Sequence, residues 1–285
     1  MTVATLTDVL LPAMANRTAV AGLVVLGWED ARAFVEAADE TGLPVILQAG
    51  PGCRSYTPLP ILGKMFRVLA EQARVPVVCH IDHATTLDEC MRGIDHGFTS
   101  VMIDGSALAL AANIALTCQV VEAARLAGVS VEGEVGVVGY ADGRPSSFTS
   151  AAEARRFEAE TDVDALAISV GNVHLQTEKS DGIDLEALEA IEAATKVPLV
   201  LHGGSGIPPA MRRRLARDTR VKKFNIGTEL RMAFGRALRK SLTDHPQSFD
   251  RLQLLGATIE PLKVEAKAAM MALAVDEELA TRSAG

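Results

Sequence analysis

Short apolar runs alternate with amphipathic stretches along the chain from about residue 20 onward. The runs are four to six residues long and rich in Val, Ile and Leu, which is typical of strands buried on both faces of a parallel sheet. They predict eight strands, at residues 21–26, 44–48, 76–81, 100–103, 129–134, 165–170, 198–201 and 221–225. The stretches that follow them predict helices at residues 28–41, 60–73, 87–95, 108–127, 151–160, 185–194, 208–218 and 229–241.

This alternation predicts an α/β protein with a (β/α)₈ TIM barrel, and an open doubly wound sheet is the competing topology. The positions of the polar residues favour the barrel. Nearly every predicted strand ends in ionisable, amide or Gly-rich residues, for example Asp82 and His83 after the third strand and Asn225 at the end of the eighth. Polar groups at so many strand ends converge only if the strands form a ring.

The last part of the chain carries no strand pattern. Residues 259–279 predict a helix with an apolar stripe of Ala and Met, which we expect to pack on the barrel or on a partner subunit. Residues 1–285 are therefore expected to form a single domain, with a C-terminal helical extension over residues 245–285.

The charge balance argues against nucleic-acid and membrane partners. A net charge of −8 and a pI of about 5.3 argue against both a basic nucleic-acid footprint and attraction to an anionic membrane surface. The cysteines form no CxxC pair, the N-terminus lacks the pattern of a signal peptide, and no apolar run is long enough to span a bilayer. We expect a cytoplasmic protein with reduced thiols.

Three histidines, His83, His174 and His202, each follow a predicted strand. Their wide separation in the sequence excludes a zinc finger. Three imidazoles from separate strands would leave a metal with open positions, as in catalytic Zn²⁺ sites. Spacing alone is also compatible with isolated histidines buried in a core.

Glycine-rich turns follow the seventh and eighth predicted strands. Residues 203–206 read Gly-Gly-Ser-Gly before a predicted helix, and Gly227 and Thr228 open the next helix. Adjacent loops after strands seven and eight are a recurrent phosphate site of barrel enzymes. Either turn alone would be weak evidence, because glycine often only satisfies backbone geometry.

Several carboxylates lie at the same strand ends. Asp82, beside His83, is a candidate general acid/base or a residue that orients the histidine. Glu132 and Glu134 share one strand face, where they would either serve the site or simply meet water. Asp104 is a candidate turn former or secondary metal ligand.

Six motifs follow one another along the chain, at residues 80–83, 101–106, 131–136, 164–174, 198–206 and 224–230. In this order they resemble the class II, metal-dependent fructose- and tagatose-bisphosphate aldolases. The likeness runs from about residue 6 to beyond residue 270, and six ordered motifs are far more specific than any one of them.

The resemblance implies a lyase that reversibly cleaves a ketose phosphate or bisphosphate into dihydroxyacetone phosphate and an aldehyde through an enediolate. It implies that His83, His174 and His202 hold a divalent metal, usually Zn²⁺, and that Asp104 and Glu134 belong to an alternative metal site. The metal would offset the charge that develops on the enediolate.

The same resemblance assigns roles to residues that would touch the substrate. Asp82 would exchange the proton of the C4 hydroxyl, and Asn225 would contact the substrate. A monovalent cation near the phosphate and a homodimer or homotetramer are also implied. The phosphate would be held by Gly203, Ser205, Gly227 and Thr228.

The chain departs from the family pattern at four places. The first strand, residues 23–27, lacks the usual asparagine; Gly50 replaces a serine; and Leu175 replaces the glycine after the second histidine. In the loop at residues 139–143, Asp142 stands where a catalytic glutamate of the family would be, one methylene shorter.

Because these departures affect the phosphate pocket more than the metal ligands, we expect an aldolase whose substrate differs from fructose 1,6-bisphosphate. A related ketose phosphate or a non-bisphosphate sugar derivative would fit. Two alternatives remain open from the sequence: a non-catalytic, metal-stabilised sugar-phosphate binding protein, and a barrel hydrolase in which the metal activates water.

Overall fold

The computed structural model describes residues 2–141, 143, 146–180 and 182–274 of the protein. Eight parallel strands close into a barrel in the order β4-β3-β2-β11-β10-β8-β6-β5, and the pairing of β5 with β4 completes the ring. Each lies at a predicted strand, so the (β/α)₈ barrel is confirmed over the open sheet. The strands are β2 (Val20–Val24), β3 (Val45–Ala49), β4 (Val77–Ala84), β5 (Ser100–Ile103), β6 (Ser130–Val135), β8 (Ala165–Ile168), β10 (Leu199–Leu201) and β11 (Val221–Ile226).

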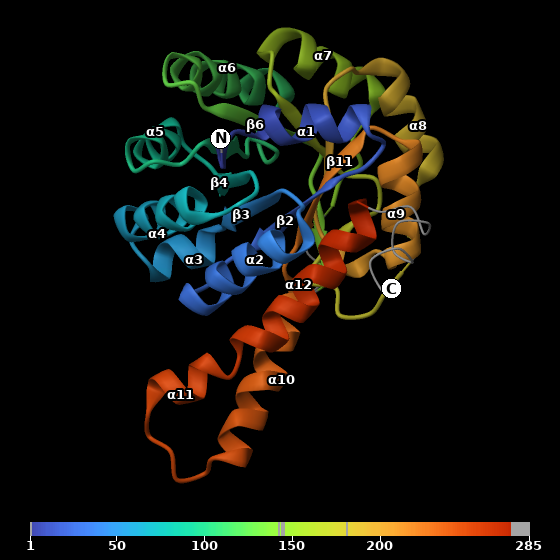
Figure 1. Ribbon diagram of the computed structural model, residues 1–285. Helices are drawn as coiled ribbons and strands as arrows, with labels where there is room; N and C mark the ends of the chain where they lie inside the picture. Colours follow the sequence, from blue (N-terminus) through green and yellow to red (C-terminus); the bar gives the residue numbers. More distant parts are fainter. Residues whose placement is uncertain (1, 142, 144–145, 181, 275–285) are drawn as a thin grey trace.

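A helix follows each barrel strand and covers the outside of the ring (Figure 1). The helices α5 and α8 begin where predicted, because Thr86 and Asp184 cap their first turns with side-chain oxygens. Within the described ranges, the helices are too short or too polar to cross a membrane. The outer helices are α2 (Trp28–Thr41), α4 (Leu59–Gln72), α5 (Leu87–Asp95), α6 (Leu110–Leu126), α7 (Ala151–Thr161), α8 (Leu185–Ala194), α9 (Pro209–Asp218) and α10 (Thr228–Asp244).

Several short elements were not predicted. Most have two to six residues, too few to show the period of a strand or helix. The exception is α1, whose ten residues include Pro12 and are mostly apolar. These elements are β1 (Val3–Ala4), α1 (Leu6–Ala15), α3 (Pro51–Tyr56), β7 (Gly139–Tyr140), β9 (Val173–His174), the 3₁₀ helix η1 (Gly204–Gly206) and α11 (Arg251–Gly256).

The helix α1 closes the amino end of the barrel. Leu6 and Leu10 of this helix pack into one buried cluster with Ile46, Val78 and Val200, which point inward from three strands. Figure 1 shows α1 lying across that end of the ring. The amino half of the barrel interior is therefore filled mostly by apolar side chains, although Ser130 at the start of β6 bonds there to Thr7 of α1, and most interior polar residues lie nearer the carboxyl ends.

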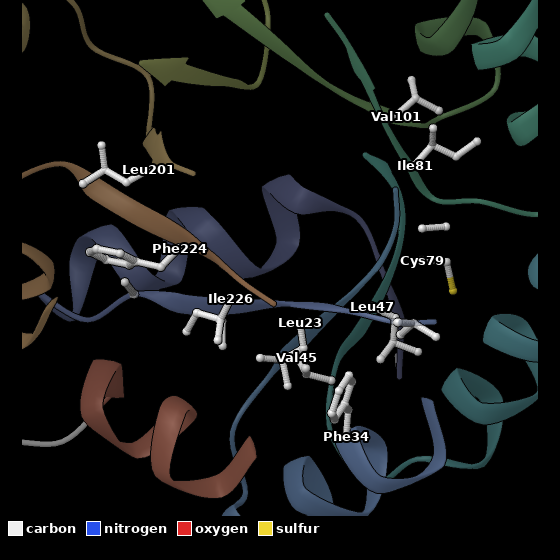
Figure 2. Packing of buried hydrophobic residues seen from close by; sticks show 14 of the residues in the cluster. Leu23, Phe34, Val45, Leu47, Cys79, Ile81, Val101, Leu201, Phe224 and Ile226 are labelled. Carbon is white, nitrogen blue, oxygen red and sulfur yellow. The ribbon is translucent and has the colours of Figure 1, made fainter. Parts of the chain in front are cut away.

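The outward-facing strand residues form a second, larger core with the helices. Figure 2 shows Leu23 and Val45 of neighbouring strands beside Phe34 of α2, with Leu47 close to them. Successive strand residues point to opposite faces, so Cys79 in β4 packs outward while its neighbours point into the barrel. This alternation fixes which side chains reach the site.

The predicted C-terminal helix is present as α12 (Ile259–Ala274), and its predicted last residues, 275–279, lie outside the described residues. It packs against α2, α9 and α10, which confirms its contact with the barrel. Lys263 of α12 pairs with Glu40 of α2 at 2.9 Å. Contact with a partner subunit stays a prediction, although α11 and the adjoining end of α10 extend away from the barrel (Figure 1).

Helix α4 packs tightly on His96, the residue that follows α5, and this contact tests the fold. A Cβ added at Gly63 would lie 2.1 Å from the backbone oxygen of His96. We expect Gly63→Ala to lower the free energy of unfolding by about 1–3 kcal/mol, because the backbone must shift. The control is Gly256→Ala in α11, where a Cβ would meet nothing within 4 Å. Urea denaturation of both variants checks this, and equal midpoints would contradict the packing.

Candidate active site

Three histidines that are far apart in the sequence meet at the carboxyl end of the barrel. His83 lies near the end of β4, His174 ends β9, and His202 follows β10. One ligand nitrogen from each lies within 4.8 Å of the others. The ring centroids are 4.6 to 5.5 Å apart. The closed barrel therefore brings together the three imidazoles predicted to share one metal.

The hydrogen bonds of two of these rings, His83 and His202, leave one nitrogen of each to bind a metal. His83 Nδ1 bonds to Asp104 Oδ2 at 2.8 Å, and His202 Nε2 bonds to Glu132 Oε1 at 3.3 Å. The opposite nitrogens, His83 Nε2 and His202 Nδ1, are buried and have no hydrogen-bond partner among the described residues. A carboxylate on one ring nitrogen fixes the tautomer that presents the other to a metal. The donor set thus fits a divalent cation.

The two carboxylates predicted for an alternative metal site also lie against His83. Ligand atoms of His83, Asp104 and Glu134 form a second group within 4.8 Å. Burial raises the pKa of Glu134 well above its usual value, and the charge of Asp104 adds to this shift while His83 opposes it. Burial alone would lower the pKa of His83, but the facing Asp82 and Asp104 raise it to about 10. A cation at this position would relieve the crowding of negative charge.

A small sheet that the sequence pattern did not reveal holds His174. Strand β9 pairs with β7, and the backbone N–H of Ala141 donates to the His174 oxygen at 3.0 Å. The Tyr140 ring lies 4.7 Å from the His174 ring. The amide of Asn172 donates to the backbone oxygen of His202 at 3.1 Å, which ties two of the histidine loops together. A two-residue strand carries no periodicity from which it could be predicted.

Asp82 points into the barrel from β4 and is almost completely buried. Its Oδ1 accepts a hydrogen bond from Asn225 Nδ2 at 3.1 Å. Burial would raise the pKa of Asp82, but the nearby His83 and Lys223 lower it below its usual value. The side chain is therefore a carboxylate at neutral pH and able to accept a proton.

Below the histidines lies a buried polar layer that the sequence reasoning missed in part. Lys223 Nζ pairs with Glu132 Oε2 at 2.7 Å, and both side chains are fully buried. His80 lies beside Lys223, and its Nδ1 is 2.8 Å from Ser100 Oγ. Burial and the charge of Lys223 hold the pKa of His80 well below its usual value. The sequence did carry a signal for this layer, because residues two apart in a strand share a face. His80 therefore lies on the same face as Asp82, and Lys223 on the same face as Asn225.

The predicted phosphate residues line one cavity together with the catalytic candidates. Ser205 Oγ accepts hydrogen bonds from the backbone N–H groups of Gly227 and Glu229, each at 3.2 Å. Arg231, in the first turns of α10, lines the same cavity and was not singled out from the sequence. The volume is about 430 Å³, and the predicted residues on its wall are Asp82, His83, His174, Gly203, Ser205, Asn225, Gly227 and Thr228.

The departures from the family pattern fall on this cavity as well. Gly50 and Leu175 both line it, beside Leu26. Leu175 has a backbone φ of +57°, a conformation that leucine rarely adopts and glycine adopts freely. The predicted loop acid, Asp142, lies outside the described residues, so its place in the site stays a prediction.

A TIM barrel with three histidines and two glycine-rich turns at its carboxyl end is typical of barrel enzymes, and its three histidines could hold a metal ion. The family model described as fructose-bisphosphate aldolase class-II matches residues 4–278. The chain belongs to this family, and its activity is retro-aldol cleavage, the reaction of a lyase. This supports the lyase over the hydrolase and the non-catalytic binding protein that the sequence left open.

Relatives with different substrate names are about equally similar to this chain. It is 33% identical to a fructose-bisphosphate aldolase from Geobacillus stearothermophilus, covering 92% of this chain and 94% of the relative. It is 35% identical to a 6-phospho-5-dehydro-2-deoxy-D-gluconate aldolase from Bacillus licheniformis, covering 91% of both. Among solved structures, the YdjI aldolase from Escherichia coli K12 superposes with a TM-score of 0.83 at 28% identity, covering 97% of this chain and 99% of that one.

The ligand assignment can be tested at one histidine. We expect His83→Ala to lose bound metal and activity, because it removes one of the three imidazoles that meet at the site. The control is His96→Ala, which changes a histidine at the end of α5. Metal analysis of the purified proteins checks this, and wild-type metal content in His83→Ala would reject the assignment.

Proposed function

We propose that this aldolase acts on a ketose phosphate or phosphorylated sugar acid other than fructose 1,6-bisphosphate, with Zn²⁺ held by His83, His174 and His202. One observation carries the proposal. His83, His174, an ionised Asp82 and the two glycine-rich turns line a single cavity, and a ring nitrogen of His202 lies within 4.8 Å of those of the other two histidines. When bound, the divalent metal would supply a Lewis acid that offsets the charge developing as the carbon–carbon bond breaks.

Asp82 is the group suited to move the hydroxyl proton. Its pKa is held low, so it can take the proton from the hydroxyl next to the bond that breaks and return it in the synthetic direction. Asn225 fixes one carboxylate oxygen of Asp82 with its Nδ2. The Oδ1 of Asn225 is buried without a partner in the described part of the chain and would accept a hydrogen bond from a substrate hydroxyl.

The turn after β10 and the start of α10 are suited to an anion. The hydroxyl oxygen of Ser205 already accepts two backbone N–H groups, so its own proton is left to donate to a phosphate oxygen. Thr228 opens α10, where the helix dipole favours negative charge. The guanidinium of Arg231 adds a positive charge on the same wall. These donors favour a phosphate at this end of the cavity.

The substrate preference is inferred from the wall that departs from the family. Leu175 keeps the left-handed backbone that a glycine would have, so the change lies in its side chain rather than in the path of the chain. With Leu26 it makes this wall apolar, and Gly50 removes a hydroxyl. The relatives named above include both a bisphosphate aldolase and a phosphorylated sugar-acid aldolase. A substrate panel run with and without chelator tests the proposal, and best turnover on fructose 1,6-bisphosphate would overturn it.

The acid/base role predicts a separation of metal binding from turnover. We expect Asp82→Ala to keep its metal and to lose turnover by ~10²–10⁴-fold, as expected for a general acid/base. Turnover is measured on the best substrate of the panel, and metal content is measured in the same preparation. Turnover close to that of the wild type would remove Asp82 from this role.

The altered wall predicts a gain of function. Gly50→Ser together with Leu175→Gly should raise kcat/KM for fructose 1,6-bisphosphate about 10- to 100-fold, since a hydrogen bond to a charged group contributes about 1.5–3 kcal/mol. Leu175→Ala tests side-chain size by itself. Alanine shortens the side chain but, unlike glycine, does not make the positive φ at this position easier to adopt. No gain in any variant would show that this wall does not set the specificity.

A further inference from the structure

The end of β4 carries the two residues most important to the proposed chemistry, yet it leaves the regular sheet. Pairing with β3 ends at Ile81. Pairing with β5 shifts between Ile81 and Ala84, so that β4 holds one residue more than its neighbour there. Asp82 and His83 lie in this bulge, and His83 has a φ of +54°. Bulges of this kind re-aim side chains near active sites.

The backbone oxygens in this bulge need other partners. Buried carbonyl groups are almost always hydrogen-bonded, and those of Asp82 and His83 lie outside the ladder pairs given for β4. Both accept hydrogen bonds from one side chain, Arg54 of α3. Its Nη1 donates to the Asp82 oxygen, and its Nη2 donates to the His83 oxygen at 3.1 Å.

The same guanidinium also reaches the neighbouring strand. Arg54 Nη1 donates to the backbone oxygen of Ala49, the last residue of β3. Arg54 Nε donates to Glu89 Oε1 of α5 at 2.8 Å. One cation thus joins the ends of two strands to a helix, and Glu89 balances its charge where only 5% of the arginine side chain is exposed.

An arginine can donate hydrogen bonds to all of these oxygens at once, and a lysine cannot. A guanidinium presents five N–H donors in a rigid plane, whereas an ammonium group is a compact charge on a flexible stem. Arg54 meets three carbonyl oxygens and a carboxylate that lie in different directions. A lysine at this position would satisfy only some of them.

We propose that Arg54 is a positioning residue for the metal site: by holding the carbonyl oxygens of Asp82 and His83, it fixes the left-handed backbone that aims the His83 imidazole at the metal. Arg54 is not among the residues that line the cavity with Asp82 and His174, and it would act through the backbone of β4. The proposal concerns the ligand geometry alone, so it holds whichever sugar phosphate is the substrate.

The experiment measures zinc affinity by competition with a chelator, in Arg54→Met, Arg54→Lys and the wild type. Loss of a residue that supports a ligand typically weakens metal binding by about 10–100-fold, and we expect this for Arg54→Met. Arg54→Lys should lie between the two, because it keeps the charge and some of the donors. The visible spectrum of the cobalt-substituted protein should change in parallel, since the ligand geometry changes.

A matched arginine at the opposite end of the barrel separates positioning from stability. Arg220 precedes β11, and its Nη2 donates to the backbone oxygen of Thr195 at 2.8 Å. Arg220→Met should lower stability but leave the zinc dissociation constant within twofold of the wild type. The proposal would be overturned if Arg54→Met kept the zinc affinity of the wild type and an unchanged cobalt spectrum. Should Arg54→Met not fold, the same result for Arg54→Lys would overturn it.

Discussion

The site depends on closure of the barrel, and in particular on the pairing of β5 with β4. Without this pair the eight strands would form an open sheet, and the strand ends that carry His83 and His202 would face different directions. Closure forces alternate residues of each strand into a narrow interior. Most of the residues beneath α1 in the amino half are apolar, and most of the polar ones are gathered at the carboxyl half, where they meet.

Burying so many ionisable groups costs free energy, because charged groups are removed from water. The structure offsets this cost by pairing the groups with one another. Lys223 neutralises Glu132, which in turn accepts from His202. Asp104 accepts from His83. Buried charges are stabilised only when they are paired and hydrogen-bonded. Among the described residues, His83 Nε2 and His202 Nδ1 are buried without a hydrogen-bond partner, and these are the two nitrogens to which a metal would bind in the proposed function.

The sequence predicted the parts of this arrangement that repeat along the chain. The strands and outer helices have several residues each, and their apolar pattern is strong enough to locate them. The histidines could be singled out because each follows a strand. The features that the sequence could not show depend on a single residue or on contacts between segments that are far apart in the chain. The bulge that turns His83 to a φ of +54° has no pattern of its own, and the bonds from Arg54 become visible only when α3 is placed against β4.

The family likeness and the geometry answer different questions. Membership of the class II aldolases fixes the reaction, while the residues around the cavity bear on the substrate, since Leu175 and Gly50 alter its wall and leave the three histidines in place. The most direct test of the central claim is anomalous diffraction at the zinc edge from crystals of the metal-loaded protein. We predict a single peak at about 2.0–2.1 Å from His83 Nε2 and His202 Nδ1, with His174 as the third ligand. A peak elsewhere, or one that leaves two of these histidines unbound, would contradict the account.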